Sequence, residues 1–104
     1  MMTIVTRVRL REGTEPEWDR VMRERLAAAR EAPGWLGGQL MMPIDGLNER
    51  VIVGCWKTRA DWETWHNDPA FQEGRRRLEG LQSGHGEQWW HEVIADERPD
   101  RLAA

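Results

Sequence analysis

The order of strand-like and helix-like segments is the feature that most constrains the fold of this chain. Apolar and polar residues alternate over residues 3–13, which predicts a strand with one apolar face. Short apolar or β-branched runs between turn residues predict three more strands, over residues 36–43, 49–57 and 87–95. The second and third are separated by a turn-forming Asp-Gly pair, so we expect them to form a hairpin.

The segments between the first and second strands and between the third and fourth strands show helical periodicity. Thr14 and Glu17 have the spacing of a capping box, and an amphipathic helix is predicted from there to about residue 31. A Thr-x-x-Asp cap opens a short helix over residues 58–66. An Asp-Pro pair then starts another helix over residues 69–81.

The resulting order is strand, helix, strand, strand, helix pair, strand. It predicts an α+β fold of the ferredoxin-like kind, an antiparallel four-stranded sheet with helices on one face. A chain of 104 residues has the size of one domain, which we assign to residues 1–95. Residues 96–104 are expected to form a polar C-terminal tail.

The second face of the predicted sheet has no cover within the chain. Val51, Val53 and Cys55 lie on it, and so does one residue of the Trp89-Trp90 pair. Because an apolar sheet face of this size is usually buried against a partner, we expect a homodimer joined sheet to sheet.

Composition and charge exclude several functional classes. The net charge is −3 with no basic excess on one face, which argues against nucleic acid as a partner. The chain shows no signal-peptide pattern and no apolar run near 18 residues, so no membrane partner and a cytoplasmic location are expected. Cys55 is the single cysteine, which excludes an internal disulfide and a cysteine-built zinc site; no metal site is predicted.

Tryptophan is concentrated in this chain, which has seven tryptophans, one phenylalanine and no tyrosine. Three of the indoles fall in the segment CWKTRADWETWH, and they could be core, a partner surface or the wall of a ligand site. If the third strand turns Ile52 and Trp56 toward the helices, Trp56 meets Trp62 and Trp65 there. We expect a mostly apolar small-molecule site between sheet and helices, lined by Thr6, Trp56, Trp62, Trp65, His66, Phe71 and Arg75.

Arg75 and His66 are the polar side chains of this predicted site. Arg75 falls on the apolar face of its helix with Phe71 and Leu78, and a buried cation needs an anion or several acceptors. Either the aliphatic stem of Arg75 extends so that its guanidinium reaches the rim of the site, or the guanidinium contacts an oxygen of a ligand. His66 has the pKa of a general base, yet it is also typical of a helix end, and no carboxylate is placed by sequence to orient it.

The segments PGWLGGQLMMPIDG and VIVGCWKTRADWETWHNDPAF resemble the antibiotic biosynthesis monooxygenase family, and the resemblance extends over roughly residues 3–95. It implies a dimeric α+β barrel. It also implies an enzyme that often works without metal or flavin, because the deprotonated aromatic substrate itself passes an electron to oxygen. A closed aromatic pocket would exclude water and stabilise the substrate anion.

Two branches of the family can be compared residue by residue. The quinone-forming members use a strand Trp, an Asn four residues before it and an Arg on the last helix. Trp56 matches the Trp, and Arg76, next to Arg75, stands at the Arg. Ile52 replaces the Asn and cannot hydrogen-bond an oxygen intermediate, and Trp62 replaces a tyrosine.

The haem-degrading members use a first-strand Asn, a Trp in the short helix and an axial His. Trp65 matches the Trp, but Thr6 stands at the Asn and Arg75 at the His. A guanidinium stays protonated and cannot be an ordinary axial ligand. His66 would replace it only in a rearranged pocket.

We therefore expect a cofactor-independent monooxygenase, or a related enzyme, that uses O2 to oxidise an aromatic or polyketide-like small molecule. The residues expected to act in catalysis are Trp56, His66, Arg75 and Arg76, and those expected to bind the substrate are Thr6, Ile52, Trp62, Trp65 and Phe71. A haem-binding or haem-degrading monooxygenase is one alternative. The other is a non-catalytic dimeric ligand-binding module whose indoles are core.

Overall fold

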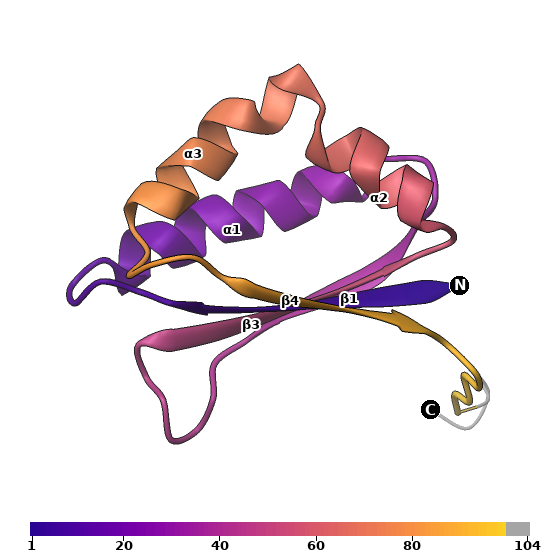
Figure 1. Cartoon of the computed structure of the whole chain (residues 1–104), viewed down its shortest axis with the longest axis horizontal. Helices are drawn as coiled ribbons and strands as arrows, with labels where there is room; N and C mark the ends of the chain where they lie inside the picture. The colour runs from indigo at the N-terminus through magenta and orange to yellow at the C-terminus, as the bar shows by residue number, and fades with distance from the viewer. Residues whose placement is uncertain (100–104) are drawn as a thin grey trace.

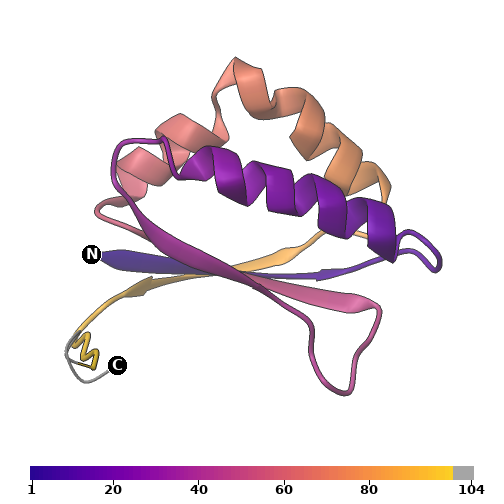
Figure 2. The same ribbon diagram turned by 180° about the vertical axis from the view of Figure 1, so that it is seen from behind.

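The computed structural model describes residues 1–99, in which the strands and helices follow one another in the predicted order. They form two layers, a sheet and a set of helices that all cover the same face of it (Figure 1). The elements are β1 (Met2–Arg9), α1 (Glu15–Ala29), β2 (Trp35–Met41), β3 (Glu49–Trp56), α2 (Arg59–His66), the 3₁₀ turn η1 (Pro69–Phe71), α3 (Gln72–Gly80) and β4 (Glu87–Glu92). Seen from behind, α1 runs along the helical side of the sheet, with α2 and α3 beside it (Figure 2).

The sheet is antiparallel throughout, with the strand order β2-β3-β1-β4. β1 is central, and its Val5 lies opposite Val53 of β3 and Trp89 of β4. This arrangement confirms the predicted ferredoxin-like α+β fold. Alternation turns Ile4, Val8 and Trp56 toward the helices, where all three are buried.

β2 carries a bulge between Trp35 and Gly37. Trp35 lies opposite Trp56 of β3, and Gly37, with a φ of +149°, lies opposite Cys55. The indole of Trp35 folds over Gly38, where an added Cβ would lie 2.5 Å from the ring atom Cη2. Gly38 therefore leaves the space in which this indole lies on the helical side of the sheet.

Two clusters of buried residues hold the helices on the sheet. The first consists of Val8, Leu10, Trp18, Val21, Met22 and Leu78. The second consists of Ile4, Ala29, Trp56 and Trp65. Trp18 and Trp56 are each only 1% exposed, so these two indoles belong to the core.

An ion pair buried at the end of β3 ties the sheet to α1. Arg50 is 6% exposed and donates to both carboxylate oxygens of Asp19, at 2.8 and 3.0 Å. It also donates to the backbone oxygens of Leu47 and Glu49, at 2.8 Å each. The guanidinium thus finds acceptors on α1, in the turn before β3 and on β3 itself, as a buried charge requires.

The local caps agree with the sequence in one place and differ in another. The predicted capping box at Thr14 is wrong, because its hydroxyl donates to the backbone oxygens of Arg11 and Leu81 and makes no cap hydrogen bond. Its partners come from the chain segments before α1 and after α3, which the helical pattern alone does not reveal. At α2 the cap is confirmed, since Thr58 Oγ1 accepts from the backbone N–H of Asp61 at 3.1 Å.

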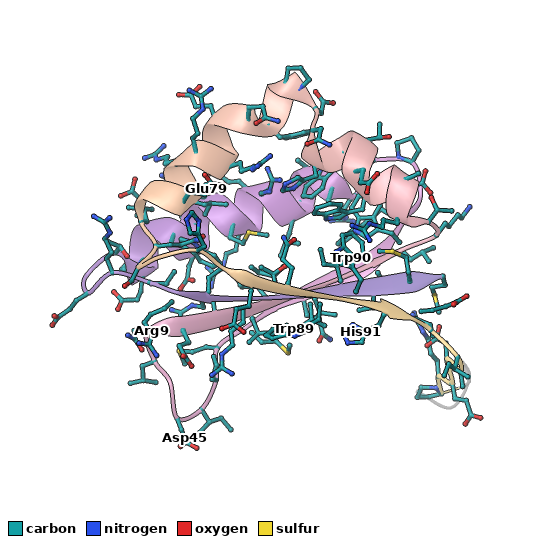
Figure 3. All side chains as sticks on the ribbon, in the orientation of Figure 1. Arg9, Asp45, Glu79, Trp89, Trp90 and His91 are labelled. Carbon is teal, nitrogen blue, oxygen red and sulfur yellow. The ribbon has the colours of Figure 1, made fainter. Side chains whose placement is uncertain are left out.

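No helix within residues 1–99 covers the second face of the sheet. Trp89 and His91 point to this side, whereas Trp90 points toward the helices (Figure 3). Trp89 is 43% exposed, and Arg7 and Arg9 on the same side both pair with Glu49, at 2.7 and 3.4 Å. The expected homodimer stays a prediction.

The chain ends differ slightly from expectation. β4 ends at Glu92 rather than Ala95, and residues 100–104 of the predicted tail lie outside the described residues. Within residues 1–99, every helix is too short or too polar to cross a membrane.

Candidate functional site

A cavity of about 550 Å³ lies between the sheet and the helices. Its walls come from all four strands, from α1, α2 and α3, and from the segment before β4. Of the residues that the sequence places in the site, seven line it: Thr6, Ile52, Trp56, Trp62, Trp65, His66 and Arg75. The size and the mixed apolar and polar lining are those of a small-molecule site.

Two of the sequence-selected residues do not line this cavity. Arg76 is exposed, because one residue along a helix turns the side chain by about 100° away from Arg75. Phe71 lies behind Trp65, with ring centroids 5.9 Å apart, and borders a second hollow of about 270 Å³. Neither side chain is placed to touch a ligand in the larger cavity.

The indoles contact one another as well as the cavity. Trp56 meets Trp35 edge-on at 5.1 Å and Trp65 at 5.5 Å between ring centroids. Trp62 stacks on His66 at 4.3 Å and meets Trp90 edge-on at 4.7 Å. The aromatic residues thus form a continuous packed wall on one side of the cavity, which fixes their ring planes before any ligand arrives.

Arg25 of α1 is a site residue that the sequence reasoning missed. Its guanidinium lies 4.4 Å above the ring of Trp65, donates to the backbone oxygen of Phe71 at 3.3 Å, and lies 3.3 Å from His66 Nδ1. Burial, and then the charge of Arg75, lower the pKa of Arg25 to about 10, so it remains a cation at neutral pH. The sequence feature that could have identified Arg25 is its position three residues after Met22, on the apolar face of the helix.

The charges around the cavity make His66 neutral and favour an anion. Burial, and then the charges of Arg75 and Arg25, lower the pKa of His66 to about 4. Arg75 donates to Glu79 Oε1 at 3.3 Å, and within residues 1–99 Glu79 is the one carboxylate among the lining residues. With Arg11 also on the wall, three guanidiniums face one carboxylate, and the excess positive charge would stabilise a negatively charged ligand.

Trp65 contributes an unused hydrogen-bond donor. Its Nε1 is buried and has no acceptor among the residues that the structure describes. A buried polar group without a partner is costly, and it is satisfied if a ligand or water supplies an oxygen. No group of three His, Cys, Asp or Glu side chains in residues 1–99 is arranged to hold a metal ion.

Comparison with known proteins agrees with the fold. Residues 1–77 match the family model described as antibiotic biosynthesis monooxygenase. A 59-residue stretch is 32% identical to a heme oxygenase (mycobilin-producing) of Mycobacterium tuberculosis H37Rv, covering 57% of this chain and 56% of that protein. The match thus spans little more than half the length of this curated relative.

Solved structures share the whole fold at low sequence identity. SnoaB, a cofactor-independent oxygenase from Streptomyces nogalater, superimposes with a TM-score of 0.81 at 20% identity, covering 91% of this chain and 94% of that one. A putative antibiotic biosynthesis monooxygenase from Nitrosomonas europaea gives a TM-score of 0.84 at 12% identity, covering 91% and 100% of the two chains. At these identities the likeness shows the fold.

Proposed function

Because this chain belongs to the antibiotic biosynthesis monooxygenase family, we propose that it uses O2 to oxidise an aromatic or polyketide-like small molecule without a bound cofactor. The observation that carries this proposal is the cavity of about 550 Å³ with an indole wall and an excess of positive charge. An electron-rich phenol or enol becomes a reductant for O2 once it is deprotonated. A site that stabilises the anion therefore promotes the first step.

The lining residues have distinct roles in this proposal. Trp56, Trp62 and Trp65 hold the planar ring and exclude water, and Ile52 supplies an apolar contact. Arg25 and Arg75 stabilise the negative charge of the substrate oxygen. Oxidation of a ring CH2 group to a carbonyl then consumes one O2. One oxygen atom enters the product, the other leaves as water, and the substrate supplies all four electrons.

Oxygen uptake with anthrone-type and hydroquinone substrates tests this function. We expect turnover by the wild type and a loss of at least about tenfold in kcat/KM for Arg75→Met, since a charged hydrogen bond to the reacting oxygen is removed. Arg76→Met is the matched control, because Arg76 is exposed beside the cavity-lining arginine. No oxygen uptake across the panel, together with no quenching of tryptophan fluorescence by these compounds, would refute the proposal.

The heme oxygenase relative makes haem the second candidate ligand. The lining residues fit haem poorly, since a guanidinium such as that of Arg75 offers no lone pair to a metal and His66 Nδ1 is contacted by Arg25. His85 also lines the cavity, from an exposed position before β4. Titration with haemin checks this interpretation: we expect no shifted Soret band that depends on His66.

We also propose that two chains associate through the open sheet face, in the cytoplasm. The exposed Trp89 and Met41 on that side support the dimer, because contact with a second chain would remove their apolar surface from water. Sedimentation at micromolar concentration tests it, and a stable monomer would contradict it.

A further inference from the structure

The contact between Arg25 and His66 determines which nitrogen of His66 carries the proton. Arg25 Nη2 lies 3.3 Å from His66 Nδ1. A guanidinium has N–H donors and no acceptor, so Nδ1 must accept. A neutral imidazole has one N–H and one lone pair on its ring nitrogens, and Arg25 occupies the lone pair. The proton of His66 therefore lies on Nε2.

We infer that Arg25 is a positioning residue that holds His66 in the Nε2–H tautomer, so that His66 donates a hydrogen bond to an anionic oxygen of the ligand and does not act as a base. The tautomer follows from the geometry alone, and only the role toward the ligand rests on the proposed function. It revises the sequence-based expectation of a general base. It also leaves His66 without a free lone pair for a metal.

The surroundings of His66 support this assignment from each neighbouring element. A histidine base is usually oriented by a carboxylate, which stabilises the imidazolium. Here α1 places a cation at that position, and α3 adds Arg75, whose charge is only partly offset by Glu79. On α2 itself, Trp62 stacks on the ring with an interplanar angle of 16° and fixes its plane. A second proton on His66 would place N–H against N–H and a positive charge between two others.

Arg25 is itself held in place, as a positioning residue must be. The ring of Trp65 lies under its guanidinium, and the backbone oxygen of Phe71 accepts from Nη1 at 3.3 Å. These two contacts leave Nη2 for the imidazole. Its neighbour Arg23, by contrast, is exposed on the same helix, so it offers a matched control.

The consequence for the ligand is a preference for charge. Two guanidiniums and one imidazole N–H give the site around His66 an excess of charged donors, so it satisfies a phenolate, enolate or carboxylate oxygen better than a neutral amide of the same shape. We therefore expect this site to select aromatic compounds that are anionic when bound.

Nitrogen-15 NMR of the imidazole rings tests the tautomer without any ligand. At pH 7 the long-range proton–nitrogen pattern of His66, assigned with His66→Gln, should be that of an Nε2–H ring, and its pKa should lie well below that of an ordinary histidine. Arg25→Met should raise this pKa and mix the two tautomers. Arg25→Lys should largely restore the wild-type pattern, and Arg23→Met should leave it unchanged. An Nδ1–H ring in the wild type, or an Arg25→Met protein with an unchanged pattern and pKa, overturns the assignment.

Ligand binding tests the donor role, with 2-naphthoate and 2-naphthamide as probes and tryptophan fluorescence as the readout. We expect the carboxylate to bind at least about tenfold more tightly than the amide, and Arg25→Met to bring this ratio near one. Equal binding of the two probes by the wild type, or binding of neither, overturns the donor role. Failure of oxygen uptake with the preference intact would instead overturn only the proposed oxidation.

Discussion

The buried pair of Arg50 with Asp19 gives the sharpest prediction about stability. Arg50→Met keeps the aliphatic stem and removes four hydrogen bonds, two to the carboxylate and two to backbone oxygens. Breaking a buried pair from one side costs ~3–5 kcal/mol, because the remaining charge loses its partner. The side chain of Asp19 is 25% exposed and can regain some water, so we expect a loss of about 3 kcal/mol in the free energy of unfolding.

A loss of that size is large for a domain of 104 residues. Typical unfolding free energies are ~5–15 kcal/mol, and 1 kcal/mol lowers Tm by about 4–8 °C in small domains, so Tm should fall by at least about 12 °C. Urea unfolding followed by tryptophan fluorescence measures the loss. Arg20→Met is the control, because the exposed pair of Arg20 with Glu24 should contribute less than about 0.5 kcal/mol. A cost of less than about 1 kcal/mol for Arg50→Met, or a cost no larger than that of the control, would contradict a stabilising role of the buried pair.

Three further predictions concern the protonation of His66, two glycines and the cap of α2. The pKa of His66 is about 4 in the folded protein and near 6.5 when unfolded, so the unfolded chain takes up the proton first. The free energy of unfolding should therefore fall as the pH drops from 6.5 toward 4, and urea titrations should show a smaller drop in His66→Gln. Gly38→Ala should destabilise by about 1–3 kcal/mol, because the added Cβ meets the ring of Trp35. Gly74→Ala, in open space on α3, should stabilise by about 0.5–1 kcal/mol. Thermal unfolding measures both glycine variants, and an equal effect of the two would contradict the close contact between Gly38 and Trp35. Thr58→Ala should cost about 1 kcal/mol by loss of the α2 cap, and an unchanged Tm would count against that cap.

The fold was accessible from the sequence because its signals are local. Strand alternation correctly placed Thr6, Ile52 and Trp56 on the helical face, and each of them lines the cavity. The cap at Thr58 was equally readable, since Thr58 and its partner Asp61 lie within one helical turn. The capping box expected at Thr14 is absent, because its hydroxyl donates to the backbone oxygen of Leu81, far away in the chain, which the local pattern does not reveal.

The site was accessible only in part, because its electrostatics come from contacts between elements. The sequence identified Arg75 from its place on an apolar helical face, and the structure places it in the cavity wall. Arg25 also lies on the apolar face of its helix, so the same interpretation was open for it. The sequence does not show, however, which of the arginines of α1 lies over Trp65. His66 was considered as a base because nothing local reveals that its nearest charged neighbour is a cation.

The single extra residue in β2 decides to which layer one indole belongs. Side chains alternate along a strand, so the interruption at Gly37 lets Trp35 and Gly38 point the same way, and Trp35 packs on Trp56. If residues 35–38 were all paired regularly with β3, without the bulge, the Trp35 ring would turn to the helix-free side of the sheet. The aromatic wall would lose one end, and a large apolar ring would be added to the surface on which we expect a second chain to dock. The β2 bulge thus affects both the shape of the cavity and the apolar area exposed on the helix-free face of the sheet.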